Sequence, residues 1–140
     1  MTNLIDSDIT IDALQQIFED AAFETLIDED GDLYLKGDSI DFPIWIRMNT
    51  SNMLHLTTYL AMKQGVDQFE ALKFTNNLNK TIILPNFYLV EREKNMVMWA
   101  GYYIPINFSI DKKIIIASAR RFAGAFRAGL NEDSKDLFFE

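Results

Sequence analysis

Three aspartates stand at alternate positions, Asp28, Asp30 and Asp32, and carboxylates at this spacing could bind a calcium ion. A calcium loop of the EF-hand type also needs glycine at its sixth position and glutamate at its twelfth. Counting from Asp28, these positions are Leu33 and Ser39, so the match fails. The sequence therefore favours a solvated hairpin turn over the alternative of a metal site, and we predict no bound metal.

The imidazole of His55 is the only one in the chain. General acid–base or triad catalysis would need a nucleophile and an orienting carboxylate close to it. On a strand, the neighbours of His55 on the same face are Met53 and Thr57, which do not supply this set. The sequence also lacks the glycine-rich motifs that bind phosphates. We therefore predict no catalytic residues, no cofactor and no enzymatic activity.

The composition excludes further classes of site. The chain has 140 residues, no cysteine and one histidine, so disulfides, thiolate nucleophiles and histidine-rich metal sites are ruled out. The formal net charge is −8, and a chain this acidic repels phosphates at long range. We therefore predict no nucleic-acid partner.

The charge is distributed unevenly along the chain. Residues 1–41 hold 12 acidic residues and one base, residues 42–130 hold 5 acidic and 11 basic residues, and residues 131–140 hold 4 acidic residues and one base. Two interpretations stay open: the charges neutralise one another within the fold, or an acidic surface selects a basic partner.

A second charge pattern lies near the C-terminus. Lys113, Arg120 and Arg127 follow one another at intervals of seven residues, so on a helix they share one face. This face is either a stripe that binds an anion or an acidic partner, or a solvated face that offsets the acidic N-terminal part.

The N-terminal segment MTNLIDSDIT lacks the cationic flank and apolar run of a signal peptide. No apolar run approaches the ~20 residues of a membrane span. We therefore expect a cytoplasmic protein without a membrane partner.

The spacing of apolar residues predicts three helices and a set of strands. The helices are expected at residues 11–22, 68–79 and 110–128, with N-caps at Thr10, Asp67 and Ser109. The strands are expected at residues 23–28, 32–36, 42–48, 53–60, 82–93 and 96–104. The pair Asp30-Gly31 predicts a type I′ hairpin turn, and Gly129 is expected just after the last helix.

The predicted order is helix, strands, helix, two strands, helix. Antiparallel strands with helices packed to one side form an α+β fold. We expect residues 1–130 to form a single domain and residues 131–140 to form an acidic tail containing Leu137, Phe138 and Phe139.

The strands are apolar on both faces. If Ile44, Ile46 and their equivalents point to the core, a second set of large side chains points the other way. Three helices can cover one face fully and the other only partly, and a large uncovered aromatic patch usually marks a partner. The alternative is coverage by the acidic tail or by helix ends. The candidate partner-binding residues are Trp45, Tyr59, Trp99 and Tyr103.

Three local strings carry a family resemblance. They are DEDGDLYL from Asp28 to Leu35, TNNLNK from Thr75 to Lys80, and FYLVEREKNMVMWAGYYIPI from Phe87 to Ile106. Together with the long last helix, they resemble the YbjN family of bacterial sensory transduction regulators over residues 10–130. Leu78 stands where many relatives carry an aromatic residue.

Two asparagines in the second string have structural interpretations. Asn79 suits the end of a helix because asparagine tolerates a left-handed conformation. Asn76, one turn earlier, could tie the helix to neighbouring backbone.

The resemblance implies a fold like that of the type III secretion chaperones, which act as dimers and hold an extended client segment against apolar surface. We therefore expect a homodimeric, chaperone-like or regulatory adaptor that binds a protein segment. The alternative is an acidic inhibitor of the immunity or antitoxin type, directed against a basic enzyme and suggested by the net charge of −11 on residues 1–41.

Overall fold

One antiparallel sheet of six strands organises the protein. The computed structural model describes residues 3–4, 9–49, 53–106 and 110–140. The helices are α1 (Ile11–Asp20), α2 (Gln68–Thr81) and α3 (Lys112–Asn131). The main strands are β2 (Glu24–Ile27), β3 (Leu33–Lys36), β4 (Ile44–Asn49), β5 (Met53–Ala61), β6 (Asn86–Glu91) and β7 (Met96–Pro105). Two short strands, β1 (Asn3–Leu4) and β8 (Ile110–Asp111), pair in a second sheet.

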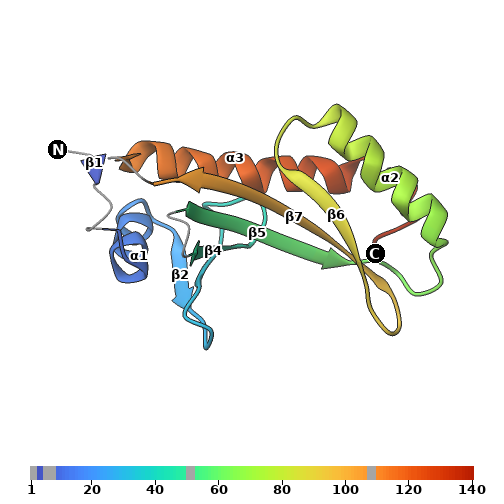
Figure 1. The fold of residues 1–140 in the computed structure, drawn as a ribbon, viewed down its shortest axis with the longest axis horizontal. Coiled ribbons are helices and arrows are strands. Elements are labelled where there is room, and N and C mark those ends of the chain that lie inside the picture. Colours follow the sequence, from blue (N-terminus) through green and yellow to red (C-terminus); the bar gives the residue numbers. More distant parts are fainter. Residues whose placement is uncertain (1–2, 5–8, 50–52, 107–109) are drawn as a thin grey trace.

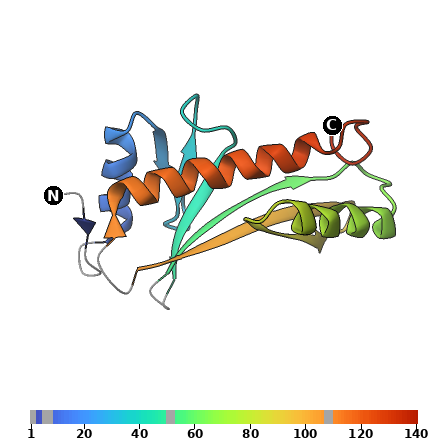
Figure 2. The same ribbon diagram turned by 90° about the horizontal axis from the view of Figure 1, so that it is seen from above.

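The strand order in the main sheet is β2-β3-β4-β5-β7-β6, and every neighbouring pair is antiparallel. Helix α3 runs along the length of the molecule, with α1 near one end and α2 near the other, as Figures 1 and 2 show. The predicted α+β class and the predicted order of elements are confirmed. None of the helices in the described part of the chain is both long and apolar enough to cross a membrane.

The hydrophobic core lies between one face of the sheet and the helices. Every second residue of the central strands points into it, including Ile44, Ile46, Leu54, Leu56 and Met98, all fully buried. From the helix side, Phe126 of α3 packs against Phe42 and Phe87, with ring centroids 4.7 and 6.1 Å apart. The predicted inward face of these strands is therefore confirmed.

Helix α3 differs from its prediction at both ends. Its N-cap is Asp111, whose carboxylate accepts a hydrogen bond from the backbone N–H of Lys113, whereas the predicted cap Ser109 lies outside the described residues. At the other end the helix continues past Gly129, which is buried inside it. A Cβ there would lie 3.2 Å from the ring of Phe87, so the glycine serves close packing instead of ending the helix.

The first two helices start as predicted. The side chains of Thr10 and Asp67 each accept a hydrogen bond from the backbone N–H three residues ahead. Helix α1 ends at Asp20, two residues early, because Ala22 adopts a left-handed conformation with φ 68°. Helix α2 continues two residues further than expected, to Thr81.

The β2–β3 hairpin is present, but its turn is not of type I′. That type requires positive φ at both central residues, whereas of the pair only Gly31 has positive φ. The Asp28 carboxylate accepts hydrogen bonds from the backbone N–H groups of Asp30 and Asp32. Because this side chain organises the loop, a longer connection with a left-handed glycine replaces the two-residue turn.

The segment 131–140 packs on the domain. Asp133 is buried, and its carboxylate accepts hydrogen bonds from the backbone N–H groups of Leu137, Phe138 and Phe139. Phe139 is buried, and the ring of Phe138 lies 4.6 Å from that of Phe74 in α2. The aromatic residues of this segment therefore extend the core next to α2.

The β6 edge of the sheet is protected by Asn79. Strand β6 starts at Asn86, four residues later than predicted, and is paired on one side only. The amide of Asn79 donates to the carbonyl of Phe87 and accepts from its N–H, both at 2.8 Å. The role expected for Asn76, tying helix to backbone, thus belongs to Asn79, which does not have a left-handed conformation. An exposed edge would otherwise offer these groups to another chain.

Replacing Asn79 by alanine removes both hydrogen bonds to Phe87. Because a typical hydrogen bond contributes about 1 kcal/mol, we expect N79A to lose about 2 kcal/mol of unfolding free energy relative to N76A. Asn76 lies one turn earlier on the same helix and is exposed, so N76A controls for helix propensity. Urea denaturation measures the difference, and equal stability of the two variants would contradict the role of Asn79.

Candidate functional site

The face of the sheet opposite the core carries a continuous line of aromatic rings. Ring centroids of Tyr34 and Trp45 are 4.6 Å apart, those of Trp45 and Tyr59 are 5.4 Å apart and stacked, and those of Tyr59 and Trp99 are 4.6 Å apart. Tyr88 stands opposite Trp99 in the strand register. We call these five residues, from five neighbouring strands, the aromatic row.

The aromatic row is accessible. Tyr59 and Tyr88 expose 41% and 40% of their surface, while Tyr34, Trp45 and Trp99 are partly buried. The alternative that the acidic tail covers this face does not match its contacts, because the tail's aromatic residues pack against Phe74 of α2. The row therefore presents aromatic surface to the outside.

Three of the four predicted binding residues, Trp45, Tyr59 and Trp99, meet in the aromatic row. The fourth, Tyr103, lies on the same face but stacks on His55 instead, with centroids 4.2 Å apart and rings 4° from parallel. Tyr34 and Tyr88 were missed by the sequence reasoning. Each of them lies between neighbours that point into the core, as Tyr34 lies between Leu33 and Leu35. This alternation is the signal that could have identified them.

A hollow of about 270 Å³ adjoins the row where the β2–β3 turn reaches the sheet. Its lining combines aromatic and charged side chains: Asp28, Asp30, Asp32, Trp45, Arg47, Thr57, Tyr59 and Trp99. Carboxylates beside exposed rings suit an organic cation, since rings and anions both attract positive charge. The hollow therefore has the chemistry to accept an organic cation on the side of the aspartates.

The three aspartates come close enough to share a metal ion, with ligand atoms within 4.8 Å of one another. However, other interactions already explain why the three aspartates lie close together. Asp28 accepts hydrogen bonds from the backbone of the turn, and Asp32 forms an ion pair of 3.0 Å with Arg47. The arrangement is thus accounted for by the turn and the ion pair.

His55 lies next to this ion pair, because Arg47 is its partner in the strand register. Partial burial lowers the pKa of His55 below its ordinary value of 6.5, the charge of Arg47 lowers it further, and Asp32 opposes both. The imidazole lies over Gly101, where a Cβ would be 3.1 Å from Nε2. Glycine at this position therefore makes room for the stacked pair of His55 and Tyr103.

The predicted cationic stripe of α3 is largely engaged in packing. The guanidinium of Arg120 lies 4.9 Å from the ring centre of Phe23. That of Arg127 lies 5.1 Å from the ring centre of Phe42 and also donates to the carbonyl of Asp41. These contacts attach the helix to Phe23, Asp41 and Phe42 through two rings and a backbone carbonyl, and none of them pairs the helix with an acidic side chain.

The surroundings of His55 predict opposite responses to two substitutions. Arg47→Gln removes a repelling cation and should raise the pKa of His55, whereas Asp32→Asn removes an attracting anion and should lower it. Because the folded pKa lies below the unfolded one, His55 should reduce stability as the pH falls below about 6.5. NMR titration of the imidazole measures the pKa values, and shifts in the same direction in both variants would contradict this account.

Comparison with known proteins agrees with this fold. A search among curated proteins finds no match, but residues 10–130 match the YbjN family, described as "Putative bacterial sensory transduction regulator". The crystal structure of YbjN from E. coli, titled a "putative transcription regulator", superimposes with a TM-score of 0.77 at 11% sequence identity, covering 94% of this chain and 97% of that one. The family match spans most of the sequence, and the chain therefore belongs to the YbjN family.

Proposed function

We propose that this protein is a non-enzymatic regulatory module that binds an extended segment of a partner protein across the aromatic row. The observation that carries the proposal is the accessible row of five rings on the face opposite the core. Aromatic residues are enriched at the centres of protein interfaces and supply much of their binding energy. The family's description as regulators supports a role exerted through partners.

The dimensions of the row suit an extended chain. Neighbouring strands lie about 4.8 Å apart, so five strands place the outer rings about 19 Å apart. An extended peptide rises about 3.3 Å per residue and covers this distance with roughly six residues. A partner segment lying across the strands could therefore contact each ring in turn, and a basic residue of the segment could enter the hollow beside Asp28.

The exposed members of the row provide the test. We expect the double substitution Tyr59→Ser and Tyr88→Ser to remove the bound partner, because truncating an aromatic residue that anchors an interface costs about 2 kcal/mol or more. Phe69→Ser is the matched control, since Phe69 is an aromatic residue of α2 that is 65% exposed. Affinity capture from the native cell extract, with quantitative mass spectrometry of the retained proteins, measures the effect.

A specific loss in the double variant, with the control unchanged, supports the proposal. Identical retained proteins in all three samples would refute it. Light scattering of the purified protein tests the homodimer that the family resemblance implies. A dimer that the double variant dissolves would assign the aromatic row to a second copy of the chain instead.

An acidic inhibitor of a basic enzyme is the second candidate, favoured by the carboxylates around the hollow. Association driven by such charges is screened by salt, since the Debye length falls from about 10 Å at 0.1 M to about 3 Å at 1 M. This candidate predicts that the captured partner binds at least about tenfold more weakly at 0.5 M than at 0.05 M salt, and that Asp30→Asn reduces the difference. An affinity that does not change with salt, measured by calorimetry, excludes it.

A further inference from the structure

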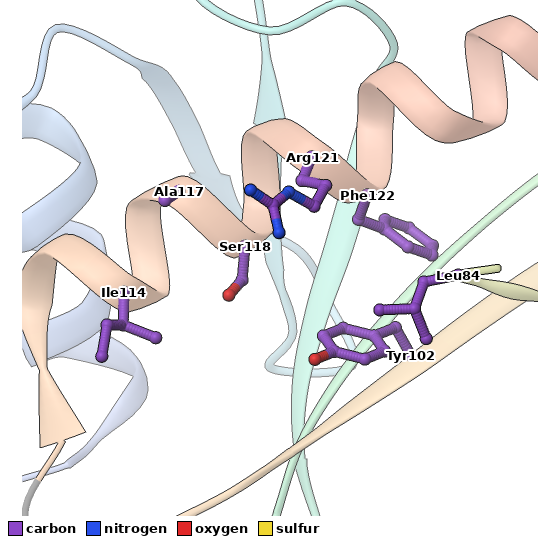
Figure 3. Close-up of a pocket in the computed structure, with 7 residues that line it drawn as sticks. All are labelled: Leu84, Tyr102, Ile114, Ala117, Ser118, Arg121 and Phe122. Atoms are coloured by element: carbon purple, nitrogen blue, oxygen red, sulfur yellow. The ribbon is translucent and has the colours of Figure 1, made fainter.

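A separate cleft lies on the opposite side of the sheet, between α3 and β7. It measures about 240 Å³ and is lined by Leu84, Tyr102, Ile114, Ala117, Ser118, Arg121 and Phe122 (Figure 3). Tyr102 belongs to the core-facing set of β7, whereas its neighbour Tyr103 belongs to the aromatic face. The cleft is therefore distinct from the aromatic row, and its occupant does not depend on the function proposed above.

Three polar groups face the same space in the cleft. The side chain of Ser118 extends from α3 toward the sheet, and the hydroxyl of Tyr102 points toward it from β7. Arg121 lies about one turn further along α3, with its guanidinium turned back toward Ser118 (Figure 3). The rest of the lining is apolar, and Ile114 and Leu84 at the cleft are 54% and 44% exposed. A small set of polar groups in an apolar cleft is typical of small-molecule sites.

Arg121 differs from the other two arginines of α3. Arg120 lies over Phe23, and Arg127 lies over Phe42 and donates to Asp41. Within the described residues, by contrast, Arg121 takes part in neither of the two ion pairs, Arg47–Asp32 and Lys73–Glu70, and in no hydrogen bond. Its guanidinium is thus available to an anion that enters the cleft.

The composition of the cleft limits the ligand. Arg121 is the one charged side chain of the lining, so it balances a singly charged head group such as a carboxylate, which it can bind with two parallel hydrogen bonds. The volume lies below the ~300–1,000 Å³ of pockets for drug-sized ligands, so the ligand is small. Its tail must be apolar to pair with the remaining wall of Ile114, Ala117 and Leu84.

We propose that the cleft between α3 and β7 binds a small amphipathic monocarboxylate, with the carboxylate on Arg121 and the hydroxyls of Ser118 and Tyr102, and the apolar tail along Ile114 and Leu84. The site offers one positive charge and two hydroxyl groups that can donate to carboxylate oxygens. The nearest alternative occupant is a second copy of the chain, since the apolar rim is exposed.

Three probes with the same eight-carbon chain separate these possibilities. Octanoate carries the proposed head group, 1-octanol lacks the charge and octylamine reverses it. We expect saturable binding of octanoate to the full chain, weaker binding of octanol and none of octylamine, measured by calorimetry below micellar concentrations. Arg121→Gln should weaken octanoate binding about tenfold or more and leave octanol unaffected.

Arg120→Gln is the matched control, because it removes the same charge from the adjacent position, which does not line the cleft. A second variant, Ala117→Leu, fills the cleft and should reduce binding of both octanoate and octanol. Thermal unfolding confirms that the three exposed substitutions leave the fold intact. The proposal is overturned if octanoate does not bind, if it binds no better than octanol, or if R121Q and R120Q weaken it equally. A dimer in light scattering that Ala117→Leu disrupts would overturn it as well, by placing a second copy in the cleft.

Discussion

The alternation of side chains along β5 and β7 is the constraint on which the rest of the molecule depends. These two strands pair over nine positions at the centre of the sheet, and neighbouring residues on each point to opposite faces. One face meets α3 and closes the core through Leu54, Leu56 and Met98. Because α3 packs on that face, the second face must reduce the contact of its large apolar side chains with water in another way. It does so by stacking aromatic rings on one another.

Ring stacking lowers the free-energy cost of leaving the second face exposed to water. Trp45, Tyr59 and Trp99 each bury part of their surface against a neighbour, so less apolar area contacts water than the residue types suggest. Stacking does not satisfy every polar group of these rings, however. The indole N–H of Trp99 is buried and has no acceptor among the described residues, which costs about 1–3 kcal/mol. A buried N–H group without an acceptor destabilises the fold locally, and local destabilisation of this kind is found at functional sites.

The sequence predicted the fold where periodicity and capping agree. Thr10 and Asp67 start their helices as expected, because a side-chain oxygen that accepts a backbone N–H is a purely local arrangement. The predictions failed where a side-chain contact overrides the local signal of a glycine. Gly129 continues α3 because Phe87, more than forty residues away, packs against it, and the Asp30-Gly31 turn gives way to a loop organised by Asp28.

The candidate site, too, was predictable where local sequence decides and not where contacts between distant residues decide. Alternation alone places Trp45, Tyr59 and Trp99 on one face, but the strand order decides which rings touch, and this order is set by long-range pairing. Tyr103 illustrates the limit, because it shares the face yet pairs with His55 across the register. The helix pattern places Arg120 on the face shared by Lys113 and Arg127 and Arg121 on a neighbouring face, but it does not show that Arg121 lines a cleft, because β7 and the segment before β6 supply the other wall.

The placement of the tryptophans has a spectroscopic consequence. The chain contains two, and both belong to the aromatic row. Intrinsic tryptophan emission therefore reports on this one surface, while the core on the other side of the sheet contributes no indole signal. A change in the colour or intensity of emission on mixing with another molecule signals an event at this face, and far-ultraviolet circular dichroism is the complementary probe for the backbone.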